Sequence, residues 1–321
     1  MPARLLLLLA LALSPMANNA AAADYPERPI KIIVPIGAGS TTDFIARLLA
    51  EKIRGPLGQP VVVENRAGAG GTIGSGLVAQ SPADGYTLLV ASSSHTVNPA
   101  IYTSLPYVTT RDFSGISMLV TLPNILVVPP AKGIASMKAL IELGRSRPGQ
   151  LNYGSGGVGS AAHMSAEQFR SAAKFEAVHV AYKGTPDVIN ELISGRLDFA
   201  FVPITTVLPQ IRAGTLLPLA LGSAERSPLL PSIQTTVEAG VPNSAYAVWI
   251  GLFVRAGTPR DIVNRLNKEV VAALKDPQVV EQLAGVGATP ALMAAEEFDT
   301  YIKTEIDSVA RTVKQAGIPT N

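Results

Sequence analysis

The stretch from residue 30 to residue 53, IKIIVPIGAGSTTDFIARLLAEKI, decides the fold of this chain. It opens with a short β-branched run, Ile30 to Val34, which predicts a strand. Ser40 and Asp43 then form an S-x-x-D capping box, after which apolar residues recur at helical spacing. A glycine turn over residues 35–42 joins the two. The stretch therefore predicts a strand, a glycine turn and an N-capped helix.

This order of elements is repeated along the chain. The N-terminal third continues with strands at 61–64 and 86–91 around a small-residue helix at 71–79, and a polar loop follows at 92–98. The middle third has strands near 125–128, 151–153, 177–182 and 197–202, with helices between them. The last third has strands at 216–221 and 248–254, then amphipathic helices at 260–274, 278–286 and 296–315. Alternating strands and helices predict parallel sheets with helices on their faces.

Two α/β units followed by a helical tail predict two similar lobes, with a chain that crosses over and returns. We expect residues 24–123 and 224–321 to form the first lobe and residues 124–223 the second. Open parallel sheets bind ligands at the carboxyl ends of their strands. The candidate ligand loops are therefore residues 35–42, 92–98, 154–163, 182–186 and 203–206.

The first two dozen residues have the pattern of a secretory signal peptide. Arg4 supplies the positive charge, Leu5 to Leu13 form an apolar run, and Ala20 to Ala23 offer the small residues of a cleavage site. The apolar run is too short for a bilayer of ~30 Å, which needs ~20 residues. We expect residues 1–23 to be removed, with cleavage near Ala23, and the mature chain to work in the periplasm. An uncleaved membrane anchor is the alternative.

Composition excludes several classes of function. The net charge is +2, aromatic residues are 5%, and no long run of like charges occurs, so nucleic-acid binding has no electrostatic footprint. The chain has no cysteine and three histidines, without an H-x-x-x-H or G-x-S-x-G motif. His95 and His163 lie on candidate loops without an acid nearby in sequence, and His179 falls in a strand, where we expect a structural role. We expect no catalytic residue, no metal site and no cofactor.

Glycine loops occur at the same place in both predicted lobes. Gly154-x-Gly156-x-x-Gly159 matches a dinucleotide fingerprint, but the next strand ends in Tyr182-Lys183 where the fingerprint needs an acid. The loop before Ser40 lacks the lysine of a phosphate-binding loop. Three readings remain open for 154–159: a dinucleotide site, a tight packing turn, and an anion site at a helix start. Two anion-friendly helix starts favour a ligand with a carboxylate. We expect the third glycine loop, residues 67–76, to serve helix packing.

Longer motifs point to a family. YPERPIKIIVPIGAGSTTDFIARLLAEKI, LGQPVVVENRAGAGGTIG, DGYTLLVASSSHTVNPAIY, LNYGSGGVGSAAH, VHVAYKGTPDVINELISGRLDFAF, ERSPLLPSIQTTVEAGVP and WIGLFVRAGTP strongly resemble the Bug-type receptors. These are the periplasmic solute-binding proteins of tripartite tricarboxylate transporters. The resemblance covers essentially the whole mature chain. It implies an α/β, two-lobed periplasmic-binding-protein fold of type II topology, with a hinge between the lobes that lets them close on a small carboxylate.

The resemblance also implies which loops hold the ligand. In such receptors the loops after the first and third strands hold one carboxylate, and the second lobe meets the distal end of the ligand. The ligand-binding residues implied here are Gly39, Ser40, Thr41, Thr42, Ser93, Ser94, His95, Ser155, Gly156, Gly159, Ser160, His163, Tyr182, Lys183, Gly184, Thr185 and Pro203. Lys183 either adds a charge-assisted bond or is a solvated loop lysine.

Two departures from the family pattern fall at the implied site. The first loop has Pro35-Ile36 and Gly39-Ser40 where the family usually has Pro-Phe and paired glycines, and Val202-Pro203 replaces a frequent Asp-Asn. Because the second change removes polar side chains, it favours an aromatic or other weakly polar acid over an amino dicarboxylate. The single tryptophan, Trp249, is expected near the hinge or the cleft.

The expected function is capture of a small organic carboxylate in the periplasm and its delivery to membrane permease subunits. We expect a monomer. A ligand-binding subunit of a sensory system, acting through a sensor kinase, is one alternative. An exported α/β enzyme that uses the Gly154–Gly159 loop is the other.

Overall fold

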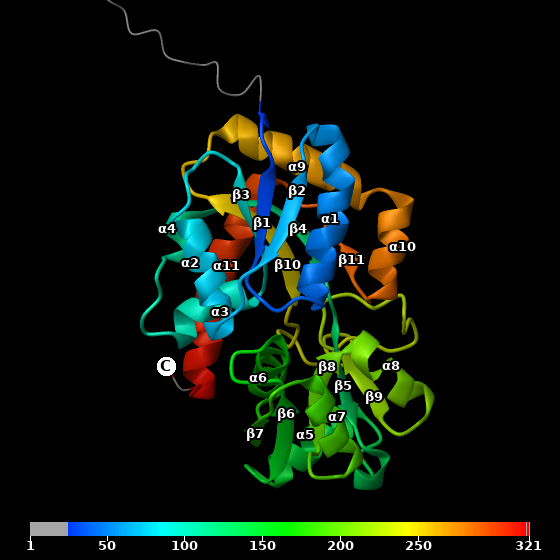
Figure 1. Cartoon of the computed structure of the whole chain (residues 1–321). Helices are drawn as coiled ribbons and strands as arrows, with labels where there is room; N and C mark the ends of the chain where they lie inside the picture. Colours follow the sequence, from blue (N-terminus) through cyan, green and yellow to red (C-terminus); the bar gives the residue numbers. More distant parts are fainter. Residues whose placement is uncertain (1–24, 319, 321) are drawn as a thin grey trace, which may run out of the picture.

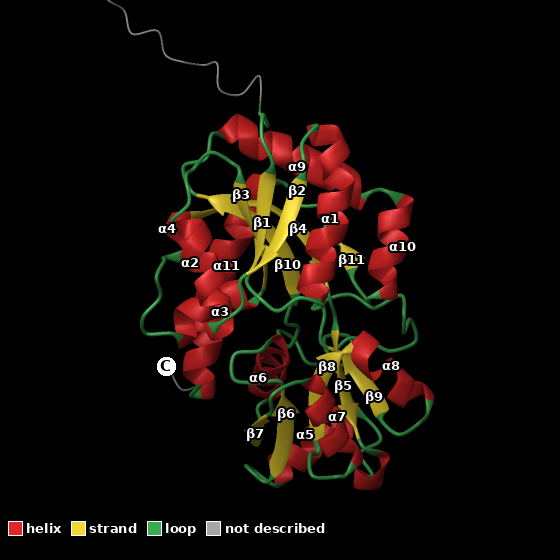
Figure 2. Ribbon diagram, in the orientation of Figure 1, coloured by secondary structure: helices red, strands yellow, loops and turns green. Residues whose placement is uncertain are grey.

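A computed structural model describes residues 25–318 and residue 320, so the expected signal peptide lies outside the described residues. The described chain forms two lobes, each built on its own sheet (Figure 1). Helices cover the sheet of each lobe, and loops connect the lobes where they meet (Figure 2). The predicted two-lobed α/β fold is confirmed. Among the described helices, none has the length and apolar character needed to cross a membrane.

The first lobe contains a six-stranded sheet within the described residues, in the order β11-β4-β10-β3-β1-β2. Its strands are β1 (Ile30–Val34), β2 (Val61–Asn65), β3 (Thr87–Ser92), β4 (Phe113–Thr121), β10 (Trp249–Arg255) and β11 (Thr289–Pro290). Its helices are α1 (Thr41–Leu57), α2 (Thr72–Ala79), α3 (Ser94–Ile101), α4 (Thr109–Asp112), α9 (Arg260–Leu274), α10 (Pro277–Gly285) and α11 (Ala295–Ala316), with a 3-10 turn at Ala69–Gly71. Apolar residues of β1, β3 and α1 pack together in one buried core of the first lobe.

The second lobe contains a five-stranded sheet within the described residues, in the order β7-β6-β8-β5-β9. Its strands are β5 (Asn124–Val128), β6 (Leu151–Ser155), β7 (Ala177–Ala181), β8 (Phe199–Pro203) and β9 (Leu217–Leu221). Its helices are α5 (Met137–Ser146), α6 (Ala161–Ala173), α7 (Thr185–Ile193) and α8 (Ile204–Arg212), with a 3-10 turn at Pro130–Lys132. Its sheet is fully covered, because separate apolar clusters pack on its two faces.

The two sheets share one topology. In the first, β1 lies between β2 and β3 and is parallel to both, and antiparallel β10 separates β3 from β4. In the second, β6 lies between β7 and β8 and is parallel to both, and antiparallel β5 separates β8 from β9. The strands β10 and β5 are the ones that enter from the other lobe. The loops after β1 and β6 therefore occupy equivalent places.

The lobes meet along α3, α6 and α11. A buried apolar cluster draws Val97 and Ile101 from α3, Met164 from α6, and Val309 and Val313 from α11. The hydroxyl of Thr312 on α11 donates to Oε1 of Gln168 on α6 at 2.9 Å. Figure 1 shows α11 as the long red helix that runs from the first lobe towards α6. This helix therefore spans the junction of the lobes.

The segment between β9 and β10 packs on the second lobe, beyond the boundary expected at residue 224. Leu229, Leu230 and Ile233 pack on one core of the second lobe, and Val241 lies in the other. The backbone N–H of Thr236 also donates to the carbonyl of Leu221 in β9 at 2.8 Å. The chain thus stays with the second lobe after residue 224 and returns near Val248. Sequence patterns missed this because the segment has neither helical nor strand periodicity.

Candidate functional site

The candidate loops converge where the lobes meet. Strand β3 ends at Ser92, which pairs with Ile250 beside the start of β10, and β1 runs parallel to β3. In the second lobe, β8 ends at Pro203, which pairs with Asn124 at the start of β5. Strands that end at the junction send their following loops into it. The loops after β1, β3, β6, β7 and β8 therefore share one region, as the parallel topology requires.

The glycine loop of the first lobe ends in the predicted capping box. The hydroxyl of Ser40 accepts the N–H of Asp43 at 3.2 Å, and Oδ2 of Asp43 accepts the N–H of Gly39 at 2.9 Å. Gly39 has φ +80°, a conformation that favours glycine. The loop therefore has a fixed shape, set by one serine and one carboxylate.

Asp43 is held by two further side chains. Nε of Arg47 donates to its Oδ2 at 3.1 Å, and Nδ2 of Asn65 donates to its Oδ1 at 2.9 Å. Burial opposes ionisation of Asp43, but the hydrogen bonds from Arg47, Gly39 and Asn65 outweigh it and lower the pKa of this carboxyl. Asn65, at the end of β2, also donates to the carbonyl of Ile36 at 3.1 Å. The ionised carboxylate of Asp43 therefore holds the first glycine loop in place through these hydrogen bonds.

The glycine loop of the second lobe has the same construction with a different side chain. The hydroxyl of Ser160 accepts the N–H of His163 at 3.3 Å, and Nδ1 of His163 accepts the N–H of Gly159 at 3.0 Å. Gly159 has φ +74°, close to the value at Gly39. His163 is 3% exposed, so it supports the loop from beneath and is not placed to contact a ligand directly. This changes the role expected from the sequence.

His179 also contacts this glycine loop and packs on His163. Its Nε2 lies 2.7 Å from Oγ of Ser155, and its ring stacks on that of His163 with centroids 3.8 Å apart. Tyr153 stacks on His179 at 5.0 Å and donates its hydroxyl to Glu167, which forms an ion pair with Arg170. Sequence reasoning found neither of these connections, because β6, β7 and α6 are brought together only by the fold.

The remaining residues expected in the second lobe lie on adjoining loops. The N–H of Tyr182 donates to the carbonyl of Ser155 at 2.9 Å, and a Cβ at Gly156 would lie 3.6 Å from Cα of Gly184. Lys183 is exposed and Thr185 half-buried at the start of α7. The loops after β6 and β7 therefore form one surface.

The residues at the end of β8 differ from what their sequence suggested. Pro203 is half-buried at the junction, whereas Val202 is 1% exposed and belongs to the core of the second lobe. Of the Val202-Pro203 pair, only Pro203 is placed to shape the site. The position in the strand explains this: both faces of the sheet are covered, so β8 is buried up to Val202, and Pro203 is its last residue, at the junction.

The loop expected after β3 is largely a helix. Helix α3 begins at Ser94, and His95 lies in its first turn with 1% of its surface exposed. The ring of His95 packs against Phe113 at 4.7 Å and Phe253 at 5.0 Å, and neither ring nitrogen has a hydrogen-bond partner among the described residues. Burial lowers the pKa of His95 to about 3. His95 is therefore a neutral core residue and not a ligand contact.

Its neighbours in the sequence are also less accessible than expected. Ser93 is 1% exposed, and Ser94 is half-buried with its hydroxyl 2.9 Å from that of Ser92. Of the three residues expected here, Ser94 alone keeps partial access. The serine-rich composition suggested a loop because serine is common in turns and caps, and the apolar pair Val97 and Ile101 was too short a helical signal.

The third glycine loop packs the first lobe, as expected from the sequence. A Cβ at Gly74 would lie 2.8 Å from both the carbonyl of Arg66 and the side chain of Pro35. The carbonyl of Gly70 accepts Nδ2 of Asn98 at 3.1 Å. This loop therefore packs against the start of the first glycine loop and is joined to α3.

Both capped helices present unpaired backbone donors to the junction. The first N–H groups of a helix have no acceptor within it, and the caps described above use those of Asp43 and His163. The N–H groups of Thr41 and Thr42 in α1, and of Ala161 and Ala162 in α6, have no acceptor among the described residues and are available to a ligand. Helix starts favour negative charge. The arrangement can therefore bind small anions. Among the described residues, no group of three His, Cys, Asp or Glu side chains is placed to hold a metal ion.

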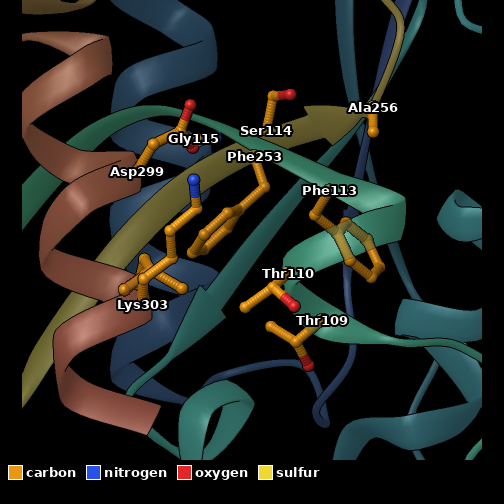
Figure 3. A pocket seen from close by; sticks show the side chains of 10 residues that line it. Thr109, Thr110, Phe113, Ser114, Gly115, Phe253, Ala256, Asp299 and Lys303 are labelled. Atoms are coloured by element: carbon orange, nitrogen blue, oxygen red, sulfur yellow. Dashed lines mark hydrogen bonds between the residues drawn. The ribbon is translucent and has the colours of Figure 1, made fainter. Parts of the chain in front are cut away.

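Two cavities lie away from these loops. One, of about 150 Å³, lies at the start of β4 and the end of β10, the strand ends farthest from the junction. Figure 3 shows Asp299 and Lys303 from α11 beside it, with Thr109 and Thr110 opposite. Oδ1 of Asp299 already accepts the N–H of Gly115 at 2.5 Å. Only the first lobe lines this cavity, so it does not combine the two glycine loops.

The second cavity, of about 260 Å³, lies between α6, α11 and residues 245–247. Glu305 lines it and accepts hydrogen bonds from Nε1 of Trp249 at 2.8 Å and from the hydroxyl of Thr96 at 2.9 Å. Burial raises the pKa of Glu305 to about 7. These bonds tie α11 to the strand that crosses between the lobes. The cavity is therefore part of the lobe junction.

The comparisons with known proteins agree on one class. The family model described as "Tripartite tricarboxylate transporter family receptor" matches residues 45–318. Protein BugT of Bordetella pertussis is 37% identical over 304 residues, which are 94% of this chain and 93% of BugT. An R. palustris protein solved with adipate is 33% identical with a TM-score of 0.78, covering 92% of this chain and 100% of that one. MatC of Rhodopseudomonas palustris with bound malate is 30% identical with a TM-score of 0.74, covering 90% of this chain and 100% of MatC.

Proposed function

Because the chain belongs to the tripartite tricarboxylate transporter receptor family, we propose that it captures a small organic carboxylate between its lobes in the periplasm. Delivery to the permease subunits of such a transporter follows from the same membership. We propose cleavage of residues 1–23 on export, and a monomer as the working unit. The proposed lobes are residues 25–121 with 248–318, and residues 124–246.

One observation carries the proposal: two helices of equivalent position, α1 and α6, begin at the lobe junction after capped glycine loops. Each presents backbone N–H groups that its own helix cannot use. A carboxylate accepts several such bonds and needs no metal or cofactor to be held. A second carboxylate, or a polar group at the other end of the ligand, would be met by the opposite lobe.

The proposed contacts follow from exposure. In the first lobe they are Gly39, Ser40, Thr41 and Ser94 by exposure, and Thr42, whose side chain is buried, through its backbone N–H. In the second lobe they are Gly156, Ser160, Tyr182, Lys183, Gly184, Thr185 and Pro203. We keep Ser155, Gly159 and His163 as residues that shape the loop, and we omit Ser93 and His95 because both are buried.

The nature of the ligand is proposed from the second lobe. The relatives solved with adipate and malate both hold dicarboxylates, by their descriptions. Pro203 offers no side-chain hydrogen bond at the end of β8, and the ring of Tyr182 is half-buried nearby. We therefore propose a ligand whose distal end is weakly polar, such as an aromatic, branched or long aliphatic acid.

Calorimetry on the purified mature chain tests this. The titrants are adipate, malate, citrate, aspartate, benzoate and a branched-chain acid, with NAD as the arm for a dinucleotide enzyme. We expect benzoate or the branched-chain acid to bind more tightly than aspartate and citrate. Tighter binding of aspartate or citrate contradicts the proposed distal end. Binding of NAD without any acid contradicts the receptor function.

A matched pair of serine variants locates the site. Ser160 caps α6 at the junction, and Ser136 caps α5 by accepting the N–H of Ala139 at 3.1 Å. Helix α5 follows the end of β5 that points away from the junction. Ser136→Ala and Ser160→Ala should each lower the free energy of unfolding by about 1 kcal/mol. Only Ser160→Ala should weaken binding; equal affinity of the two variants would place the ligand elsewhere.

A further inference from the structure

The ligand loop of the second lobe, residues 155–160, rests on two histidines. His163 accepts the N–H of Gly159 with Nδ1 at 3.0 Å, and Nε2 of His179 lies 2.7 Å from Oγ of Ser155. Gly159 and Ser155 lie at opposite ends of the loop. The two imidazoles come from α6 and β7, so they hold the loop from two elements at once.

The hydrogen bonds favour one protonation state for each ring. The single hydroxyl proton of Ser155 is donated to the carbonyl of Gly157 at 2.9 Å, so Nε2 of His179 donates to Oγ of Ser155. Nδ1 of His163 accepts a backbone N–H, so it carries no proton. Each neutral ring therefore has its proton on Nε2. A protonated His163 would lose the acceptor that holds Gly159.

The surroundings keep both rings neutral. His163 and His179 are stacked with centroids 3.8 Å apart and an interplanar angle of 11°, so two positive charges would repel strongly. The charged groups nearby, Glu167 and Arg170, form an ion pair of 2.6 Å with each other. Burial lowers the pKa of His163 to about 3, with His179 and Arg170 adding to the effect. The pair is thus a packed, neutral unit.

We infer that His163 and His179 are positioning residues, which as a neutral stacked pair hold the ends of the second ligand loop and aim the N–H groups of α6 at the ligand. The part concerning the ligand rests on the proposed function; the part concerning the loop does not. A neutral acceptor matters here because a carboxylate at this position would repel the anion that the helix start is to bind.

Three substitutions at His163 test separately whether the loop needs a hydrogen-bond acceptor at this position and whether ligand binding needs that acceptor to be neutral. His163→Asn keeps a neutral acceptor, because its Oδ1 takes the place of Nδ1. His163→Asp keeps the acceptor but adds a negative charge, as Asp43 does in the first lobe. His163→Ala removes the acceptor. Ring ¹⁵N shifts, amide hydrogen exchange at Gly159 and affinity for the panel acid that the wild type binds most tightly, starting with adipate, are measured for each.

We expect neutral Nε2–H tautomers for both rings at pH 7. Exchange at Gly159 should be about tenfold faster in His163→Ala and near the wild-type rate in the Asn and Asp variants. Affinity should fall about tenfold in His163→Ala and at least about tenfold in His163→Asp, where the loop is intact and the charge is wrong. His163→Asn should bind within about threefold of the wild type.

Several results would overturn this inference. They are an imidazolium or Nδ1–H form of His163 at pH 7, wild-type exchange in His163→Ala, and binding by His163→Asp as tight as that by His163→Asn. If the proposed function is wrong, the measurements should give a different set of results. In that case no acid binds even to the wild type, while the tautomers and the exchange at Gly159 still report the role of the histidines.

Discussion

The two glycine loops are built alike but supported by opposite kinds of side chain. Each follows the strand at the equivalent place in its sheet, β1 or β6, has a left-handed glycine before a serine N-cap, and is closed by the third residue of the helix. In the first lobe this residue is Asp43, an ionised carboxylate paired with Arg47 at 3.0 Å. In the second lobe it is His163, a buried neutral imidazole.

This difference teaches where an anion is favoured. Asp43 already brings negative charge to the start of α1, whereas the start of α6 keeps the positive end of its dipole uncompensated. A carboxylate of the ligand should therefore gain more free energy at the start of α6 than at the start of α1. The loop in the first lobe already accommodates the carboxylate of Asp43. The loop in the second lobe has no such carboxylate, so its helix start is more favourable to an anion from the ligand.

The same glycine substitution should affect the two loops unequally. A Cβ at Gly39 has nothing within 4 Å, so Gly39→Ala should cost only the left-handed strain of about 1 kcal/mol. A Cβ at Gly159 would overlap Cδ1 of Ile101 across the lobe junction, so Gly159→Ala should cost about 2–3 kcal/mol. Denaturant unfolding measures both. Ile101→Val, which removes that methyl, should recover part of the second loss, and equal costs in the two loops would contradict the comparison.

As the pH falls, the contributions of His163 and Asp43 to the free energy of unfolding should be lost in different pH ranges. The pKa of His163 is lowered in the folded chain, so its contribution is complete above its unfolded pKa of about 6.5 and is lost as pH falls towards 3. Between pH 7.5 and 5 this amounts to about 2 kcal/mol. The pKa of Asp43 is also lowered, so its contribution is lost only below about pH 4.

Unfolding free energies across pH test this. His163→Asn should have a flatter profile than the wild type from pH 7 to pH 4.5, because His95 and Glu305 titrate in both chains and cancel. Asp43→Asn should differ in slope only below about pH 4. A slope in His163→Asn equal to that of the wild type would mean that His163 is not the neutral support described here.

His95→Phe tests the other histidine predicted to bind a ligand. Both ring nitrogens of His95 are buried without a partner among the described residues, so an aromatic ring without polar atoms should raise the free energy of unfolding by about 1 kcal/mol. Carboxylate affinity should not change, because the ring lies in the core of the first lobe. A loss of affinity would restore His95 to the site.

The smallest effect should be optical. Trp249 is fully buried beside the crossing between the lobes, and Glu305 accepts from its Nε1 with both oxygens, at 2.9 and 2.8 Å. Ligand-driven movement of the lobes should change the surroundings of this ring, which lies beside the crossing between the lobes, and shift its emission by a few nanometres. An unchanged spectrum at saturating ligand would place Trp249 outside the moving region.

The sequence by itself determined the repeated strand, glycine turn and capped helix, because periodicity, caps and turns are local. It placed Ser40 and Asp43 in a capping box and placed the loops at the carboxyl ends of the strands. Only the tertiary structure decided which side chains reach the junction. His95 and Val202 are buried in the cores of their lobes, and residues 229–241 pack on the second lobe. His163 of α6 stacks on His179 of β7. These outcomes depend on burial and on contacts between distant segments, which leave no mark on local spacing.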